Sequence, residues 1–205
     1  MRCDAPRWGH HGRESHYPAG MATKSEPTIV ECTGETELIG DRMIVRLPDD
    51  TSMALPSRGQ VAATVLVDGH THPTVIEPDG RRGHWIAIDD GLRSELDLAA
   101  GTSVDLEIQP TKSWPEPDVP EDFSAAISEA SDVSELWDDI TPMARWEWVR
   151  WINATKNPVT RDRRVEVGVS KLRSGKRRPC CFDLSSCTDP ELAKSGKLVE
   201  PEERG

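Results

Sequence analysis

The sequence has no long apolar run, and no segment approaches the roughly 18–20 consecutive apolar residues that a membrane-spanning helix needs. No apolar segment near the N-terminus has the form of a secretory signal peptide. Apolar residues make up only 36% of the 205 residues, yet they gather in periodic runs that can form a core. We therefore expect a cytoplasmic protein of one or two domains without a membrane span.

The signatures of common enzyme classes are also missing. We find no nucleophile elbow, phosphate-binding loop, dinucleotide fingerprint, HExxH zinc motif or kinase motif set. The acidic pairs Asp89-Asp90 and Asp138-Asp139 are neighbours in the sequence, so each pair points apart and is poorly arranged for joint acid–base work. We therefore predict a protein that is not an enzyme and that uses no cofactor.

Cysteine is scarce and its number is odd. The five cysteines are Cys3, Cys32, Cys180, Cys181 and Cys187. In a chain without a secretion signal this favours reduced thiols over a disulfide framework. The last three lack paired CxxC spacing, which makes them weak candidates for a metal site, although a three-thiolate site completed by His84, or a redox role, stays open.

The charge is dominated by acids, with 36 Asp and Glu against 25 Lys and Arg, for a formal net charge of −11. This balance disfavours a general nucleic-acid coat. Residues 1–27 show no periodicity, so we expect them to be disordered, and Met21 is a candidate for the true start. Residues 179–205 end acidic and polar, and we expect them to be mostly disordered as well.

Short alternating strands and turns fill residues 28–109. The strongest β segment, Gln60–Val67, is followed at once by Asp68-Gly69, a typical two-residue hairpin turn. Residues 90–97 have the spacing of one or two helical turns. Five or six strands in this stretch predict a small β-barrel or sandwich.

Three histidines surround the predicted hairpin. His70 and His72 are two apart on a strand and would point to the same face, so a pair of metal ligands is geometrically open to them. With His84 they offer only three ring nitrogens, and no nearby Cys or Glu has ligand spacing. We expect all three to be exposed turn histidines.

A proline-rich linker over residues 110–119 separates the strands from a region with helical periodicity, residues 120–178. Four helices are expected there. Asp132 with Glu135 suggests a capping box, Thr141-Pro142 and Asn157-Pro158 suggest helix starts, and Gly175 a helix end. The predicted fold class is therefore α+β, with an N-terminal barrel followed by a helical module.

The helical region carries the strongest chemical features. Eight cations lie close together in the sequence: Arg161, Arg163, Arg164, Lys171, Arg173, Lys176, Arg177 and Arg178. On a helix Arg161, Arg164 and Lys171 fall near one side, where they could bind phosphate or an acidic partner. The alternative is a solvated face paired with Asp138, Asp139 and Glu147.

Tryptophans are the second feature, at positions 137, 146, 148 and 151. Their spacing favours core packing, but Trp148 and Trp151 form a stripe of their own that could stack on a ligand. An arginine on an indole face would fix the fourth helix against the third. The candidate binding residues are therefore Arg161, Arg164, Lys171, Trp148 and Trp151.

The helical half also resembles a known family. Its Val-Pro-Glu-Asp-Phe entry at 119–123, the helix end at 146–156 and the Thr-Arg-Asp-Arg-Arg helix start at 160–164 are similar to those of the YdeI/OmpD-associated, or bacteriocin-protection, family. The strand-rich half is similar to the barrel domain of unknown function that often precedes this module. The resemblance implies a double-split-like barrel and a bacterial stress or bacteriocin-tolerance context, with no catalytic residues.

Three functional interpretations follow. The first is a non-enzymatic protein that binds an unknown protein or small molecule. The second is a nucleic-acid-binding regulator that uses the Arg161–Arg178 segment and dimerises through the barrel. The third is a thiol or metal site at the C-terminal cysteines.

Overall fold

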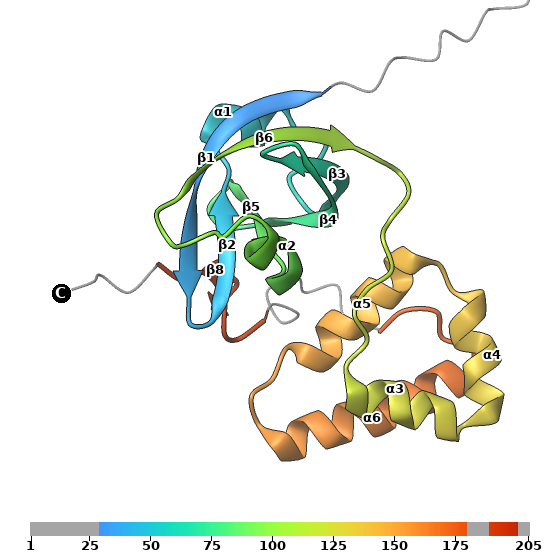
Figure 1. Cartoon of the computed structure of the whole chain (residues 1–205). Helices are drawn as coiled ribbons and strands as arrows, with labels where there is room; N and C mark the ends of the chain where they lie inside the picture. The colour runs from blue at the N-terminus through green and yellow to red at the C-terminus, as the bar shows by residue number, and fades with distance from the viewer. Residues whose placement is uncertain (1–28, 180–188, 201–205) are drawn as a thin grey trace, which may run out of the picture.

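The computed structural model describes residues 29–179 and 189–200, which form a β-barrel, a group of helices and a short C-terminal hairpin (Figure 1). The barrel is a closed ring of six strands in the order β1-β2-β5-β4-β3-β6. These strands are β1 (Val30–Ile39), β2 (Arg42–Arg46), β3 (Val61–Val67), β4 (His70–Pro78), β5 (His84–Ile88) and β6 (Ser103–Pro110). Every neighbouring pair in the ring is antiparallel.

The ring closes because β1 is long enough to pair twice. Its first part, from Val30, pairs with β6, and its last part, to Ile39, pairs with β2. Gly34 lies near the end of the first part, opposite Val104 of β6. A Cβ atom there would sit 2.3 Å from Cγ1 of the fully buried Val45, so only glycine permits this approach of β1 to the inside of the barrel.

Alternation along the strands fills the barrel with aliphatic side chains. In β6, Val104, Leu106 and Ile108 are buried while the residues between them are exposed. The predicted hairpin at Asp68-Gly69 is confirmed, with Val67 opposite His70 across the turn and both turn residues at positive φ. Two short helices, α1 (Asp49–Ala54) and α2 (Asp90–Glu95), complete the barrel domain.

The histidine prediction is wrong for two of the three residues. His72 and His84 are buried, and both hydrogen-bond through Nε2 to backbone carbonyls, of Ala87 at 2.9 Å and of Gly59 at 3.1 Å. His72 Nδ1 also lies 3.3 Å from Asp89, whose side chain caps α2. Burial lowers the pKa of His84. These rings fasten strands and turns, whereas His70 alone is partly exposed.

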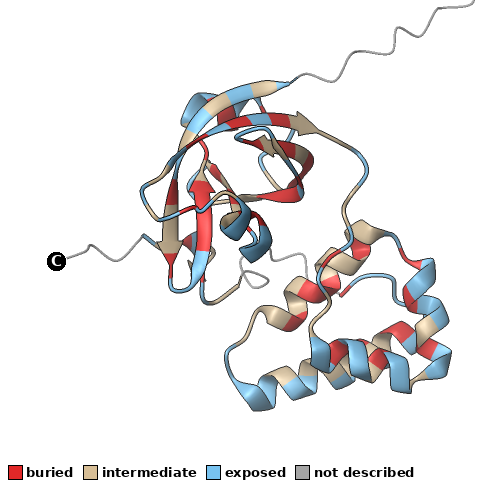
Figure 2. Cartoon of the chain, in the orientation of Figure 1, coloured by how far each residue is buried: buried red, intermediate tan, exposed pale blue. Residues whose placement is uncertain are grey.

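Four helices follow the linker, as the periodicity predicts, and we call them the helical module. They are α3 (Glu121–Glu129), α4 (Ser131–Asp139), α5 (Pro142–Asn153) and α6 (Pro158–Arg173). The α+β fold class is therefore confirmed. Figure 2 shows buried positions on the inward sides of these helices and inside the barrel, which gives each half its own core.

The helix starts at Thr141 and Asn157 are confirmed, since their side chains accept hydrogen bonds from Ala144 and Thr160. Gly175, at a φ of +79°, follows the end of α6. The predicted capping box at Asp132 is wrong. Helix α4 already begins at Ser131 without a side-chain cap, and Asp132 instead binds Arg173 of α6.

Residues 189–200 correct the prediction of a mostly disordered tail. They include two short strands, β7 (Ala193–Lys194) and β8 (Lys197–Leu198), and we call the segment the C-terminal hairpin. Leu192 and Leu198 are 3% and 2% exposed, packed with Ile39 and Ile44 on the outer wall of the barrel. These two leucines are the apolar anchors of an otherwise polar stretch. No helix of the described residues is long and apolar enough to cross a bilayer.

Candidate functional site: a pocket between the barrel and the helices

The predicted binding residues on α5 and α6 contact one another. Trp151 is half-buried, and both the Arg164 guanidinium and the Lys171 ammonium lie over its ring, 5.5 and 5.4 Å from the centroid. Arg164 also donates a 2.6 Å hydrogen bond to the Trp151 carbonyl oxygen. Trp148 is fully buried and donates from Nε1 to the Arg177 carbonyl oxygen. The structure thus brings four candidates together as a stack that joins α5 to α6.

Arg161 fastens the start of α6 to the rest of the module. Its Nε and Nη2 donate to the two carboxylate oxygens of Asp122 at 2.5 and 2.9 Å, and its Nη1 donates to Asn153 at 3.1 Å. This bidentate contact lowers the pKa of Asp122 and raises that of Arg161. The guanidinium expected to face a partner is therefore engaged between three helices.

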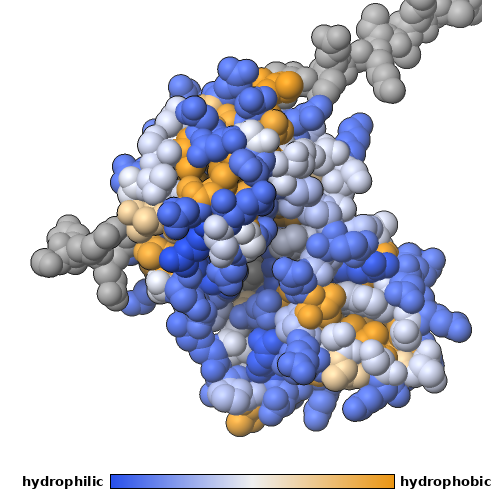
Figure 3. Space-filling model, viewed as in Figure 1, coloured by the Kyte–Doolittle hydropathy of each residue, from blue (hydrophilic) through white to orange (hydrophobic). Residues whose placement is uncertain are grey.

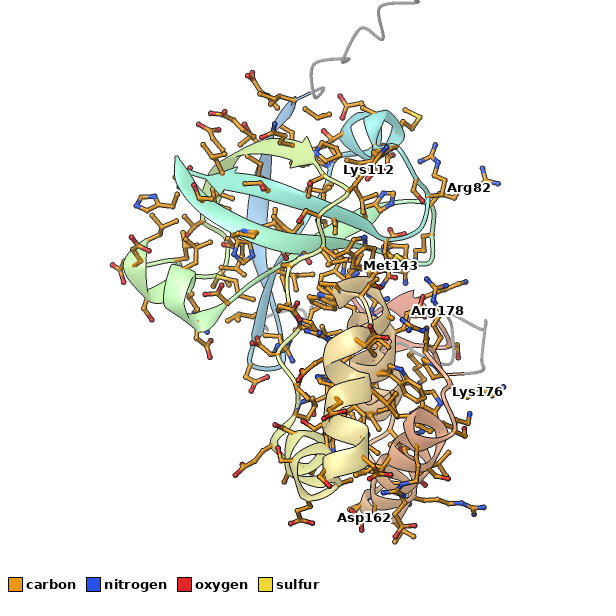
Figure 4. All side chains as sticks on the ribbon, turned by 90° about the vertical axis from the view of Figure 1, so that its right-hand side faces the viewer. Arg82, Lys112, Met143, Asp162, Lys176 and Arg178 are labelled. Atoms are coloured by element: carbon orange, nitrogen blue, oxygen red, sulfur yellow. The ribbon has the colours of Figure 1, made fainter. Side chains whose placement is uncertain are left out.

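Other cations of the basic segment have acidic partners as well. The pairs are Arg173 with Asp132, Arg177 with Asp139 and Arg178 with Glu147. Figure 4 shows Lys176 and Arg178 on one side of the helical module and Asp162 at the end far from the barrel. The basic segment therefore behaves largely as the sequence alternative proposed, a solvated face whose charges the module's own acids offset.

A pocket of about 200 Å³ opens where three separate parts of the chain meet. The barrel contributes Arg42, Thr74, Val75, Glu77, Pro78, Trp85 and Ala87. Helix α5 contributes Trp146, Val149, Arg150 and Asn153, and the C-terminal hairpin contributes Asp189, Leu192, Ala193, Gly196 and Leu198. Six of these lining residues are polar or charged, and the others are apolar. A largely apolar lining with a few polar groups suits a small organic ligand.

Two indoles line this pocket, one from the barrel and one from the helical module. Trp85 comes from β5, on the outside of the barrel, and packs beside the hairpin leucines. Trp146 comes from α5, and its Nε1 donates a 2.7 Å hydrogen bond to the Pro115 carbonyl oxygen of the linker. That bond fixes the indole without using the ring face. Aromatic walls of this kind favour planar ligands.

The charges of the pocket are paired. Glu77 on the barrel and Arg150 on α5 form an ion pair across the domain boundary, and each side chain is only 16% exposed. At the rim Arg42 lies 3.6 Å from Asp189 of the hairpin. The lining thus carries balanced charge around an apolar surface, and an arginine stands beside each of its two carboxylates.

The proposed metal site gains no support from the described residues, in which no three His, Cys, Asp or Glu side chains gather as metal ligands do. Cys180, Cys181 and Cys187 lie outside the described residues, so the prediction for them stays a prediction. His84, offered as a fourth ligand, already uses its Nε2 on Gly59.

The sequence pattern does not reveal the pocket residues, because their spacing predicts core packing. The spacing of the tryptophans favours core packing for Trp146, whereas in the structure this indole lines the pocket beside the barrel. Trp85 lies off the face used by Ile86 and Ile88, and an outward indole on a strand was the one available signal. Figure 3 shows the molecule from the side seen in Figure 1. Its surface is hydrophilic over most of this side, with apolar patches on both the barrel and the helical module.

Comparison with known families agrees with this architecture. Residues 28–108 match the family model for a domain of unknown function, DUF1905. Residues 116–175 match the OmdA model, described as bacteriocin-protection, YdeI or OmpD-associated. A search of curated proteins found no match to the chain. The barrel is thus the DUF1905 part, and the helices are the OmdA part.

Proposed function

We propose that this chain, in which a DUF1905 domain precedes a YdeI/OmpD-associated domain, is a non-enzymatic cytoplasmic binding protein of a bacterial stress or bacteriocin-tolerance response. The description of the matched family, which names bacteriocin protection, supports that context. The observation that carries the binding function is the pocket between the domains, with one indole from each domain. The ligand is a small planar organic molecule.

The arrangement of polar groups supports binding over catalysis. A general base or nucleophile needs a titratable group free to exchange a proton with the substrate. In the pocket, Glu77 forms an ion pair with Arg150, and Asp189 lies 3.6 Å from Arg42, so both carboxylates already have a cationic partner. Apart from Thr74 and Asn153, the other side chains that line the pocket are apolar or indoles.

The nucleic-acid interpretation is not favoured by the basic helix. Arg161 and Arg173 each hold a carboxylate within the module, and Arg164 lies on the Trp151 ring. A phosphate backbone would have to displace these partners. If Arg161→Glu combined with Arg164→Glu removed salt-dependent retention of DNA or RNA, this alternative would replace the first.

The proposal is tested with three planar probes that differ in charge: indole, benzoate and benzylamine. Ligand-detected NMR should show saturable binding of at least one probe. Ala87→Trp, which fills the pocket from β5, should weaken that binding about ten-fold or more, since occupied volume leaves no room for a ring. Ala125→Trp, an exposed position on α3, is the matched control.

Two results would contradict the proposal. One is the absence of binding by all three probes at millimolar concentration. The other is binding that Ala87→Trp leaves unchanged. The non-enzymatic part is tested separately, by incubating the protein with a metabolite extract. Turnover that is lost on replacing a single polar pocket residue would overturn it.

A further inference from the structure

The C-terminal hairpin occupies the outer wall of the barrel in the way that a bound peptide would. It follows the helical module in sequence and returns to the barrel at β1, β2, β5 and the turn between β4 and β5. Its anchors are Leu192 and Leu198, which pack against Ile39, Ile44 and Trp85 in a cluster separate from the barrel interior.

Two arginines of the barrel hold the backbone of the hairpin. Arg81 Nη1 donates to the Leu198 carbonyl oxygen at 2.8 Å, and Arg46 Nη2 donates to the Val199 carbonyl oxygen at 2.7 Å. Both also lie near the Glu200 carboxylate, at 2.8 Å for Arg81 and 3.4 Å for Arg46. Two consecutive carbonyls and the next carboxylate are therefore recognised together.

The hairpin contributes no strand to the barrel. Its strands pair only with each other among the described residues, and the six-stranded ring is closed without them. Because the barrel interior has its own aliphatic core, the hairpin could leave without opening that core. Departure would instead expose a face with Ile39, Ile44 and three arginines, Arg42, Arg46 and Arg81.

We infer that this face is a binding site for an acidic peptide of a partner protein, and that the chain's own hairpin fills it in this structure. The contacts define the peptide: two aliphatic anchors six residues apart, as Leu192 and Leu198 are, with an acidic residue two positions after the second. Arginines that fork onto carbonyl and carboxylate oxygens provide the specificity. The partner peptide displaces the hairpin.

Displacement would also remove the third wall of the pocket, because both leucines line it. Peptide binding and pocket access are thereby coupled. The inference itself rests on the hairpin contacts and does not depend on a ligand in the pocket. A failed peptide experiment leaves the proposed function standing, and a failed probe experiment leaves this inference standing.

The test uses the full chain and a fluorescent peptide of residues 189–205. In Leu192→Asp with Leu198→Asp the tethered hairpin should leave, and the peptide should then bind at least about ten-fold more tightly than to the unchanged chain, where the hairpin competes at roughly millimolar effective concentration. A peptide with the same two substitutions should not bind. The milder Leu198→Ala variant should show a smaller gain and guards against misfolding of the double variant.

Substitutions on the barrel test the proposed peptide-binding face. They are made in the chain that also carries Leu192→Asp and Leu198→Asp, in which the hairpin has left the barrel. Arg46→Glu with Arg81→Glu should abolish binding, and a Glu200→Lys peptide should recover part of it. Gly80→Ala should also block the peptide, since its Cβ would lie 2.1 Å from the Gly196 carbonyl oxygen. Gly40→Ala is the matched control, also at positive φ but with nothing within 4 Å of its Cβ.

Two outcomes overturn the inference. The first is that the Leu192→Asp with Leu198→Asp variant keeps native near-ultraviolet circular dichroism but does not bind the peptide, and that the Leu198→Ala variant does not bind it either. The second concerns a different occupant, a second copy of the chain. If the unchanged protein were a dimer by light scattering, and Leu192→Asp with Leu198→Asp made it monomeric, the hairpin would be exchanged between copies and the face would serve self-association.

Discussion

Helix α5 presents two faces that look alike in sequence, and the structure uses them differently. One face carries Trp148 into the core of the helical module and Trp151 toward α6, where Arg164 and Lys171 cover the Trp151 ring. The other carries Trp146 and Arg150 toward the barrel, where the fit leaves a pocket. Aromatic and basic residues can form a ligand site only where neighbouring helices and strands do not already cover their side chains.

The largest expected difference between these faces is in stability. Trp148→Ala should lower the free energy of unfolding by about 3–5 kcal/mol, because it empties the centre of the helical core. Trp146→Ala should cost clearly less, since that indole borders a pocket, and should instead weaken binding of the planar probes. Urea unfolding of both variants measures the contrast. If both variants lost the same free energy of unfolding, the two faces of α5 would not differ in the way described.

The second expected effect concerns the contact between the domains. In a double-mutant cycle, Glu77→Ala and Arg150→Ala should show a coupling of about 1–3 kcal/mol, because both side chains are largely removed from solvent. Arg145 with Glu116 is the matched pair from the same helix, with Glu116 60% exposed. Its coupling should stay below about 1 kcal/mol. A larger coupling for the exposed pair would contradict this account.

How much of the structure the sequence predicts depends on whether the contacts are local or join residues far apart in the chain. The strands, the turn at Asp68 and the helix starts at Thr141 and Asn157 are local, and periodicity with capping chemistry predicts them. The pocket joins Arg42, Trp85, Trp146 and Leu192, which are far apart in the chain, and no local pattern encodes that meeting. The C-terminal hairpin is not predicted for a related reason, because two isolated leucines show no strand or helix periodicity.

Histidine burial and cation pairing illustrate the same limit. His84 follows a turn, where exposure is the ordinary expectation, and its burial follows from the closing of the barrel around it. Arg161 lies on the outward side of an isolated α6, but α3 supplies Asp122 from 39 residues away. Whether a cation is available to a partner is decided by packing between elements, which sequence spacing does not report.

A third, smaller effect follows from that pair. Because Arg161 lowers the pKa of Asp122, the pair stabilises the fold above the ordinary Asp pKa, and this contribution is lost as the pH falls through the lower folded-state value. Asp122→Asn should therefore cost up to about 1 kcal/mol at pH 7, the group being partly exposed. The cost should shrink as the pH falls below the ordinary Asp pKa of about 3.9 and disappear once the lower folded-state value is passed. Arg163→Gln, at an exposed position, should cost less, and a pH-independent loss for Asp122→Asn would contradict the linkage.

The smallest effect has the opposite sign. Burial raises the pKa of Glu147, and Arg178 at 3.3 Å offsets this only in part. A carboxyl whose folded pKa is raised contributes stability below its unfolded pKa and loses that contribution as the pH rises through the folded value. Glu147→Gln should therefore stabilise the protein by a few tenths of a kcal/mol at pH 7, roughly the scale of a surface charge.

That gain should disappear below about pH 4, where the carboxyl is protonated in both states. Glu135→Gln, on the exposed side of α4, is the control and should change little across the same range. Unfolding by urea at several pH values resolves the two curves. If Glu147→Gln destabilised the protein at pH 7, the attraction of Arg178 would outweigh desolvation, and the C-terminal end of the basic segment would be fastened to α5 as firmly as Arg161 is to α3.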